Sequence, residues 1–443
     1  TYKEFTALCD GGNDPAKTNT VCEVEMTALI STLSYTAGQA FSAKAIAVNE
    51  KGSSTISAVS TGTVLAQVKP TIAPPLVQAT STKDTVTLSW TAVTADASKG
   101  YSDITSYKVY QVSGGSDTFV KEETVSTTGT TISSLTPAGA TFEYRVAALN
   151  VHGEGPRSDP PTSILLAGVP EKMAVVGIAQ SGQTVTLSWS EPVNNGEAIS
   201  HYEILIEDKA DNTFKEFQAL CNGTDAATIT AKSCSIQMSQ FTSTLSYPIG
   251  ATIKAKAIAH NAKGPSPVSE ESTSTIVAQS APTAAATNIA GTSTTTSVTL
   301  SWDALATGAN SGYSDVTSWV VYSDSGAGTE SYSSAATPST HTGTVIGSLS
   351  EGTVYKFKVA AVNVHGEGPQ SAAFTIRAAA KPDQMDPVVV SQTPGSTKVT
   401  FDWTEPTTNG AAISAYQILL LDKSDDTYKE FTALCDGGND PAK

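Results

Sequence analysis

The chain has 443 residues, a formal net charge of −16 and only 15% charged residues, so it is too long for one domain, and its acidic balance disfavours nucleic acid as a partner. No stretch approaches eighteen consecutive apolar residues, which argues against a membrane span. Serine and threonine are abundant, and both favour strands and turns over helices. We therefore expect an all-β protein of three or four domains.

A tryptophan closes an alternating apolar run about once every hundred residues. These runs are VTLSW at Trp90, Trp189 and Trp302, and VTFDW at Trp403. A turn and a strand with a central aromatic residue follow each tryptophan. Later an alternating strand ends in asparagine, at Asn49, Asn150, Asn261 and Asn363. Alternation with one apolar face is typical of a strand lying on a core, and several short strands per hundred residues indicate β-sandwiches.

These elements resemble fibronectin type III domains, through the tryptophan strand and the pattern L-x-P/E-G-x-x-Y/F-x-F/Y-x-V-x-A-x-N-x-x-G-x-G-P. Residues 135–156 and 349–369 match it best. The resemblance implies a tandem array of immunoglobulin-like β-sandwiches. It also implies a tyrosine whose hydroxyl fixes the turn into the sixth strand, which Tyr355 supplies. Phe41, Phe142 and Ile253 replace it elsewhere, so we expect packing alone to fix those turns.

The domains are of two alternating types. Type B carries GYSD and NVHGEGP, whereas type A carries E-P-x-x-N-G and a cysteine segment. The predicted order is residues 1–67, the C-terminal half of a type A domain; 68–168, type B; 169–278, type A with a disulfide; 279–379, type B; and 380–443, the N-terminal half of a type A domain that continues further.

Residues 1–17 and 427–443 are the same seventeen letters, TYKEFTALCDGGNDPAK, whereas residues 213–229 match them at only eight positions. The repeating unit is therefore predicted to be four domains and 426 residues long. The chain is either a window on a longer periodic polypeptide, which we favour, or a unit whose neighbours donate half-domains head to tail. Heterologous contacts of the second kind generate open filaments, so both alternatives predict a fibre.

Five cysteines accompany the type A domains. Cys9 and Cys22 are 13 residues apart, as are Cys221 and Cys234, which predicts two local disulfides. Cys435 repeats Cys9, so its partner is expected past residue 443. Disulfides indicate an extracellular or cell-surface location. A zinc site is the less favoured alternative because no histidine lies within a cysteine loop. Residues 221–239 also resemble a segment repeated in very large surface proteins of unicellular eukaryotes.

No catalytic motif is present, so we expect no enzyme activity and no cofactor. His152 and His365 occupy the same place in NVHGEGP; a shared turn is favoured over a repeated contact. Acidic residues in two regions are candidate calcium ligands, although plain turns are favoured at both: residues 10–14 in a cysteine loop, and Asp96, Asp103, Asp303 and Asp315 beside the GYSD turns.

Sugars are expected on the surface. Asn222-Gly223-Thr224 is an N-x-T acceptor for an N-linked glycan. Threonine-rich runs such as residues 291–297 are candidates for O-linked sugars. A carbohydrate-binding role would need exposed aromatic platforms, but Trp319, which replaces Tyr107 of the other type B domain, holds a core position.

The sequence thus predicts a structural protein of an extracellular filament or surface appendage, whose partner is itself. Short linkers containing proline are expected to hold successive domains in fixed relation. The alternative function is a spacer array in a cell-surface adhesion or receptor ectodomain. No nucleic acid, metal or membrane span is part of either hypothesis.

Overall fold

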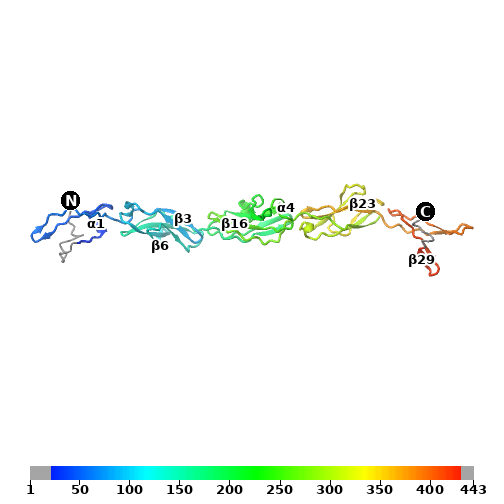
Figure 1. Cartoon of the computed structure of the whole chain (residues 1–443), viewed down its shortest axis with the longest axis horizontal. Coiled ribbons are helices and arrows are strands. Elements are labelled where there is room, and N and C mark those ends of the chain that lie inside the picture. Colours follow the sequence, from blue (N-terminus) through cyan, green and yellow to red (C-terminus); the bar gives the residue numbers. More distant parts are fainter. Residues whose placement is uncertain (1–20, 431–443) are drawn as a thin grey trace.

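The computed structural model describes residues 21–430, which form an elongated rod (Figure 1). Three β-sandwiches lie in a row, and we call them sandwich I (strands β3 to β10), sandwich II (β11 to β17) and sandwich III (β18 to β25). Residues 21–66, the first segment, extend from one end, and residues 380–430, the last segment, extend from the other (Figure 1).

Sandwich I packs a three-stranded sheet on a five-stranded sheet. The smaller sheet contains β3 (Leu76–Ser81), β4 (Val86–Trp90) and β7 (Gly129–Ile132). The larger contains β5 (Ile104–Ser113), β6 (Ser116–Thr124), β8 (Thr141–Asn150), β9 (Gly153–Arg157) and β10 (Thr162–Leu165). All pairings in it are antiparallel.

Sandwich III repeats this arrangement. Its smaller sheet contains β18 (Ala290–Ser293), β19 (Val298–Ser301) and β22 (Thr344–Ile346). Its larger sheet contains β20 (Ser318–Ser323), β21 (Ser333–Ala336), β23 (Val354–Asn363), β24 (Gly366–Glu367) and β25 (Phe374–Arg377). In β23 the side chains of Tyr355, Phe357 and Val359 are buried in the core, as the alternation predicts.

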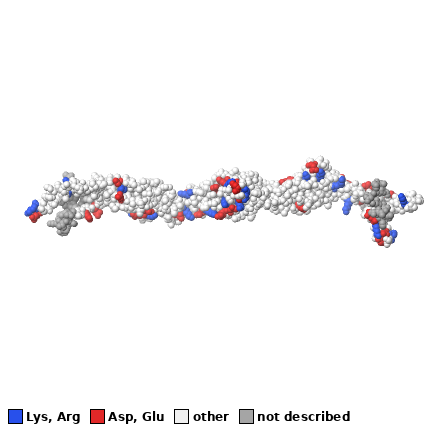
Figure 2. All heavy atoms as spheres, viewed as in Figure 1, with Lys and Arg blue, Asp and Glu red and all other residues white. Residues whose placement is uncertain are grey.

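Sandwich II packs three strands on four. The first sheet contains β11 (Gly177–Ser181), β12 (Thr184–Ser188) and β15 (Ser233–Gln237). The second contains β13 (His201–Asp208), β14 (Thr213–Glu216), β16 (Ala255–Asn261) and β17 (Gly264–Pro265). Charged side chains gather over this middle part of the rod in Figure 2, whereas much of the remaining face shown is uncharged.

The two end segments have sparser secondary structure. The first contains helix α1 (Met26–Leu33) and the hairpin of β1 (Val48–Asn49) and β2 (Gly52–Ser53). The last contains two separate hairpins, β26 (Val389–Ser391) with β27 (Thr400–Asp402) and β28 (Leu419–Asp422) with β29 (Thr427–Glu430). Neither forms a closed sandwich within the described residues.

Short helices fill loops of the sandwiches: α2 (Asp96–Lys99), the 3-10 helix η1 (Ala309–Ser311), α3 (Ala226–Ala231) and α4 (Met238–Ser243). Asp225 caps α3 by accepting hydrogen bonds from the backbone N–H groups of Ala227 and Thr228. Helices of three to six residues are too short to show helical periodicity, so the sequence gives no clear signal for them.

Each core is centred on the tryptophan of the repeated run and an aromatic ring of the opposite sheet. Trp90 lies 5.5 Å from Tyr107 and Trp189 lies 5.5 Å from Tyr202, measured between ring centroids. Trp302 lies 5.6 Å from Trp319. Trp319 is 3% exposed, so it holds a core position and offers no binding platform.

The turn into the sixth strand is fixed by a hydroxyl in two of the sandwiches. Tyr355 accepts a hydrogen bond from the backbone N–H of Ser350 at 2.8 Å. In sandwich II, Tyr247 accepts one from the N–H of Lys254 at 3.4 Å. The expectation that packing alone fixes this turn beside Ile253 is therefore wrong, because the tyrosine comes from the preceding loop.

Buried serine side chains hold residues 266–272, which follow β17, against β16. Ser266, Ser269 and Ser272 each accept a hydrogen bond from an alanine N–H of β16, at 2.9–3.0 Å. Ser54, Ser57 and Ser60 make the same bonds in the first segment, at 3.0–3.1 Å. The serines recur every third residue. The hydroxyl of each one therefore accepts the hydrogen bond that a backbone carbonyl oxygen would accept in an ordinary β-ladder.

We expect Ser269→Ala to destabilise sandwich II by about 1–3 kcal/mol, because the buried N–H of Ala257 loses its acceptor. Hydrogen exchange detected by mass spectrometry should then be faster in peptides that cover β16. The matched control is Thr273→Ala, which changes an exposed residue of the same segment. Equal exchange rates in the two variants would contradict the role of the serine hydroxyls.

Candidate functional site: the junctions between sandwiches

The junction from type A to type B is built on a glycine beneath a tyrosine ring. Gly250 of sandwich II has φ +87, and a Cβ built on it would lie 2.5 Å from the ring of Tyr313. In the first segment Gly38 has φ +85, and its Cβ would lie 2.3 Å from the ring of Tyr101. Both tyrosines belong to GYSD. Only glycine allows this backbone conformation and this approach together.

An asparagine ties the same junction to the linker. Asn150 Nδ2 donates to the carbonyl oxygens of Val68 and Lys99, both at 2.8 Å. Asn363 Nδ2 donates to those of Ser280 at 2.8 Å and Ser311 at 2.9 Å. Both asparagines are buried, so these bonds are shielded from water and hold the linker against the GYSD turn.

The histidines of NVHGEGP contact the linker as well. The Nε2 atom of His152 lies 3.0 Å from Gln67 Oε1, and that of His365 lies 2.9 Å from Gln279 Oε1. Burial lowers the pKa of His365, which favours the neutral ring. A carbonyl oxygen only accepts, so Nε2 carries the hydrogen. The two histidines therefore combine the shared turn with a repeated contact.

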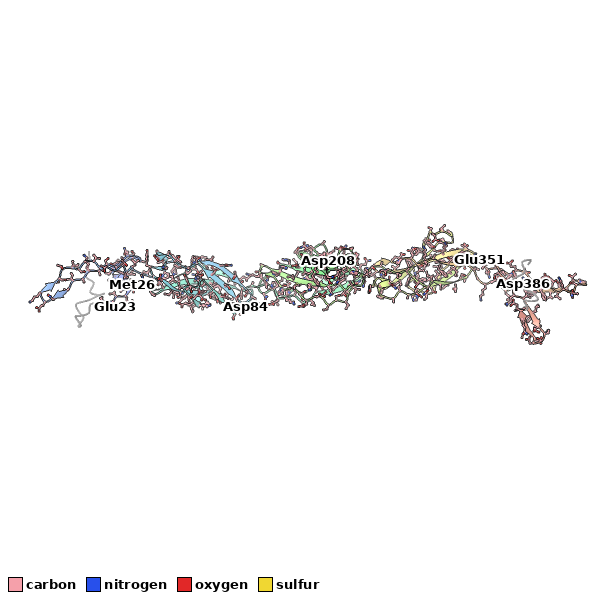
Figure 3. All side chains as sticks on the ribbon, viewed as in Figure 1. Glu23, Met26, Asp84, Asp208, Glu351 and Asp386 are labelled. Carbon is pink, nitrogen blue, oxygen red and sulfur yellow. A yellow bond between two sulfur atoms is a disulfide. The ribbon has the colours of Figure 1, made fainter. Side chains whose placement is uncertain are left out.

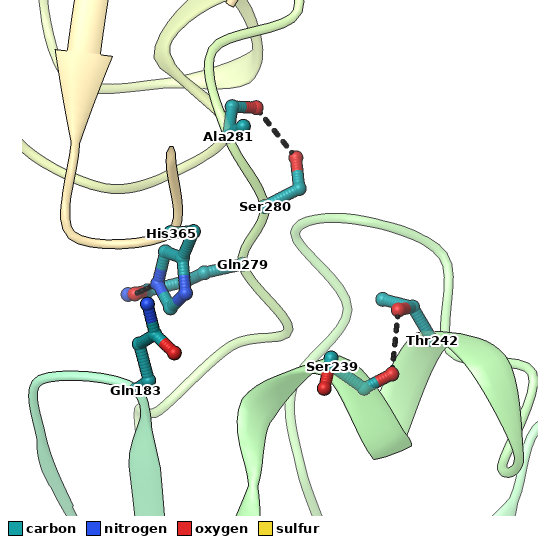
Figure 4. Close-up of a pocket in the computed structure, with 7 residues that line it drawn as sticks. All are labelled: Gln183, Ser239, Thr242, Gln279, Ser280, Ala281 and His365. Carbon is teal, nitrogen blue, oxygen red and sulfur yellow. Dashed lines mark hydrogen bonds between the residues drawn. The ribbon is translucent and has the colours of Figure 1, made fainter. Parts of the chain in front are cut away.

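Side chains of sandwich II also contact the linker and the NVHGEGP turn at this junction. Gln180 Nε2 donates to Gln279 Oε1 at 2.6 Å, and Gln183 Nε2 donates to the carbonyl oxygen of Val364. Gln183, Gln279 and His365 line a cleft of about 200 Å³ between sandwiches II and III (Figure 4). Side chains of both sandwiches thus meet through one linker glutamine.

The junction from type B to type A joins two glycines. A Cβ on Gly196 would lie 2.3 Å from the nitrogen of Gly139 and 2.6 Å from the oxygen of Leu166. A Cβ on Gly410 would lie 2.7 Å from the nitrogen of Gly352. The N-G of E-P-x-x-N-G therefore supplies the glycine that lets the two backbones touch.

The asparagine of this N-G pair holds the linker. Asn195 Nδ2 donates to the oxygen of Val169 at 2.7 Å and to Glu171 at 3.2 Å. Asn409 Nδ2 donates to the oxygen of Lys381 at 2.8 Å and to Asp383 at 2.9 Å. The pKa of each acid is lowered, that of Glu171 chiefly by its hydrogen bond from Lys83 and that of Asp383 chiefly by Asn409.

The motifs that recur in the sequence therefore gather at the junctions. Sequence reasoning missed three pairs of residues there: Gly38 and Gly250, Gly139 and Gly352, and Gln67 and Gln279. Their signal is recurrence at equivalent places in both A–B pairs. Gly352 also stands in the L-x-P/E-G pattern, but nothing in that pattern indicates a contact with the next domain. The glycine, asparagine and histidine contacts occur in both copies of their junction, whereas the contacts of Gln180 and Gln183 belong to the junction between sandwiches II and III.

The acidic residues considered for calcium have other partners. Asp96 and Asp103 both pair with Lys99, at 3.2 Å and 2.9 Å. Asp303 accepts from Asn288 at 2.6 Å, and Asp315 accepts from Thr307. Residues 10–14 lie outside the described residues. In the described part of the chain, no group of three or more His, Cys, Asp or Glu side chains could hold a metal ion.

The cysteine loop of sandwich II is closed by a bond between Cys221 and Cys234. Cys22 is also disulfide-bonded, whereas Cys9 and Cys435 lie outside the described residues. Within the loop, Asn222 Oδ1 accepts hydrogen bonds from the backbone N–H and the hydroxyl of Thr224, at 3.1 Å and 2.7 Å. Asn222 is half-buried and Thr224 is exposed.

Comparisons with known proteins agree with this architecture. The family model for the fibronectin type III domain matches residues 72–164 and 280–377. The chain is 32% identical over 168 residues to Tyrosine-protein phosphatase Lar of Drosophila melanogaster, covering 37% of this chain and 8% of that protein. It is 25% identical over 307 residues to Neogenin of Homo sapiens, covering 65% of this chain and 19% of that protein.

A solved structure, the FN1–FN3 domains of chicken CNTN1, aligns with 70% of this chain and 99% of its own, at 18% identity and a TM-score of 0.26. The chain spans less than a fifth of the length of either curated relative. None of the helices in residues 21–430 has the length and apolar character to cross a membrane. Residues 72–164 and 280–377 are fibronectin type III domains, and the chain is an all-β tandem array built on that sandwich fold.

Proposed function

We propose that the chain is a stiff extracellular spacer, a length of rod within a longer surface protein. The observation that carries this proposal is the repetition of contacts at the junctions. Backbone meets backbone at Gly139 and Gly196, and a buried asparagine binds each linker from type A to type B. Such contacts resist bending where a flexible linker would permit it.

The matches to longer proteins support the spacer over the filament. Lar and Neogenin each contain a stretch similar to this chain inside a much longer polypeptide. The phosphatase activity in the name of Lar is not proposed for this chain, because the match covers only 8% of that protein. The disulfide between Cys221 and Cys234 suits an oxidising, extracellular compartment.

A filament is the second candidate, favoured by the identity of residues 1–17 and 427–443 across 426 residues. A helical assembly needs equivalent surroundings for each unit, which repeats of that fidelity would supply. The resemblance to surface proteins of unicellular eukaryotes and the pairing of Cys9 with Cys22 also stay proposals. Electron microscopy of native material separates the two candidates, since threads with an axial repeat of two or four domains support the filament.

The junction between sandwiches I and II offers a direct test of stiffness. We expect Gly196→Ala to bend the rod there, because the added Cβ would lie 2.3 Å from the nitrogen of Gly139. Gly182→Ala is the matched control, since Gly182 also has positive φ but has no atom within 4 Å of an added Cβ. Small-angle scattering and single-particle images measure the angle.

A broader distribution of angles at this one junction in Gly196→Ala, with both sandwiches still folded, is the expected result. The control is expected to keep the straight form of the unmodified chain. Equal distributions in all three proteins would mean that the glycine contact does not orient the sandwiches. An unmodified chain that already bends freely at every junction would overturn the spacer proposal.

We propose that Asn222 carries an N-linked glycan, because the acceptor lies in the loop closed by the disulfide and Thr224 is exposed. Peptide mapping of protein secreted from eukaryotic cells, before and after treatment with peptide N-glycosidase, checks it. The expected result is a glycopeptide that the enzyme converts, absent in Thr224→Ala. An unmodified Asn222 in the secreted protein would contradict the prediction.

A further inference from the structure

Two histidines face each other on neighbouring strands of sandwich II. His201 begins β13, which ends at Asp208 in the middle of the rod (Figure 3), and His260 lies opposite it on β16. The two imidazole rings are stacked, with their centroids 4.3 Å apart and their planes 14° apart. Both side chains are half-buried, so solvent reaches the pair. Neither histidine takes part in the junction contacts described above.

In the sequence this pair occurs once. His201 precedes Tyr202, the ring partner of Trp189, and His260 precedes Asn261, the asparagine that ends its strand. The equivalent positions of the other sandwiches and of the end segments hold no histidine: Ser106 and Leu149, Ser318 and Val362, and Ala415 and Val48. The fold therefore does not require histidine at either position, and sandwich II has both histidines together.

Hydrogen bonds determine which nitrogen of His201 carries the hydrogen. The hydroxyl of Ser200 donates its one hydrogen to the carbonyl oxygen of His260 at 3.1 Å. The same hydroxyl oxygen lies 2.9 Å from Nδ1 of His201, so it accepts a hydrogen bond from Nδ1–H. In the neutral ring the lone pair is then on Nε2, which has no hydrogen-bond partner among residues 21–430.

His260 is held in a similar way by a carboxylate. Its Nε2 atom lies 3.3 Å from Oε2 of Glu203, and a carboxylate only accepts hydrogen bonds, so Nε2 carries the hydrogen. In the neutral ring the lone pair is then on Nδ1, which also has no hydrogen-bond partner in the described part of the chain. Each ring therefore has one nitrogen fixed by an acceptor and one nitrogen open to a ligand.

The charges around the pair favour a bound cation. Burial, followed by the neighbouring His260, lowers the pKa of His201, whereas Glu216 and Glu203 act against this shift. His201 is therefore neutral near pH 7, as a histidine that ligates a metal must be. The two carboxylates that act on His201 carry negative charge, so they attract a cation to the rings.

We propose that His201 and His260 together bind a divalent transition-metal ion of the class of Zn²⁺ and Cu²⁺, through Nε2 of His201 and Nδ1 of His260. Imidazole suits both ions as a ligand. Each ring donates its other N–H to a second group, Ser200 or Glu203, which is how metal-bound histidines are oriented. The site has two protein ligands, and water completes the coordination sphere.

The spacing of the rings suits one shared ion. A histidine nitrogen lies about 2.1 Å from zinc, so two nitrogens on one ion are up to about 4.2 Å apart. The ring centroids are 4.3 Å apart, so a limited rotation of the rings about their Cβ–Cγ bonds brings one nitrogen of each to the ion. Because the two histidines belong to different strands, the ion would join β13 to β16.

The ion would lie at the end of sandwich II that meets sandwich I. Asn261, which follows His260, donates hydrogen bonds to the carbonyl oxygens of Gly168 at 2.9 Å and Asn194 at 3.1 Å. A bound ion would therefore stabilise the strand pair beside this junction. The inference goes beyond the spacer function, since ion binding and the angle between sandwiches are measured separately.

Hydrogen exchange of the 443-residue chain, with and without added Zn²⁺ near pH 7, tests the proposal. Peptides that cover residues 201–208 and 255–261 should exchange more slowly with the ion, by up to about 100-fold when its concentration is 100 times the Kd. Peptides from sandwiches I and III should be unchanged. If about 1 mM Zn²⁺ did not slow exchange in β13 and β16, the proposal would be overturned.

A double variant, His201→Ala with His260→Val, makes the test specific. It introduces the residues that Ala415 and Val48 supply at the equivalent positions, so sandwich II is expected to stay folded, which circular dichroism checks. Zn²⁺ should no longer slow exchange in this variant. The matched control is His341→Ala, which removes one histidine from sandwich III and should keep the effect. Equal slowing in the double variant and the unmodified chain would contradict the site.

Electron paramagnetic resonance with Cu²⁺ identifies the ligands directly, and it does so even if the double variant is unstable. The unmodified chain and His341→Ala should each show one bound ion with two imidazole nitrogens. His201→Ala alone should lose one of the two nitrogens and bind the ion more weakly, by about tenfold or more. A spectrum of the unmodified chain with fewer than two imidazole nitrogens would overturn the proposed site.

Discussion

Replacing both Cys221 and Cys234 with serine is expected to lower the free energy of unfolding of sandwich II by about 3 kcal/mol. The bond closes a separation of 13 residues, and constraining a loop of that size reduces the freedom of the unfolded chain by about this amount. Cys221 is 1% exposed and belongs to the core, so the loop is anchored inside the sandwich.

Hydrogen exchange resolves this effect within the tandem chain. Peptides that cover β12 and β15 should exchange about 100-fold faster in the double variant. Sandwiches I and III should be unchanged and serve as internal controls. The unmodified chain treated with a reductant should behave like the double variant, and unchanged exchange in β12 and β15 would contradict a stabilising role of the bond.

Phe241→Ala in helix α4 is expected to destabilise sandwich II by about 3–5 kcal/mol. Phe241 is 0% exposed and its ring meets that of Tyr247 edge-on, at 5.6 Å between centroids. Truncation removes buried apolar surface and leaves a cavity. The same exchange measurement, over peptides from residues 238–261, gives the magnitude.

Phe241→Leu is the matched variant, because the equivalent residue of the first segment is Leu29. A leucine fills most of the space, so we expect a much smaller loss. If the alanine and leucine variants lost equal stability, the ring contact with Tyr247 would carry the effect instead of the filled volume.

The strands could be predicted because alternation and the repeated tryptophan reflect burial directly. β23, with Tyr355 and Phe357 facing the core, follows from its sequence alone. The junctions could not be predicted in the same way, because Gly139 and Gly196 come from loops 57 residues apart that meet only when two sandwiches stack. Gln279 likewise joins Gln180 and His365 from two different sandwiches.

The asymmetry between predicted and missed features has a physical cause. A strand's pattern is local, whereas a contact between domains depends on the direction of a linker. The tyrosine of sandwich II illustrates the point, since Tyr247 replaces the usual hydroxyl from a loop whose position the sequence does not specify. Recurrence of a residue in equivalent domains is the remaining signal, and it marks places without stating their partners.

The serine-linked segment of sandwich II has a mechanical consequence. A load along the rod enters this sandwich near β11 in one sheet and leaves after residue 278, beyond the segment held to β16 in the other. The load therefore shears the bonds of Ser266, Ser269 and Ser272 together. Residues 266–278 already run alongside residues 259–251, a span of about 27 Å at roughly 3.4 Å a residue. Their release would therefore lengthen the chain by at most about 15 Å, the difference from their own extended length of about 41 Å, which makes this segment a small reserve of extension under strong pulling.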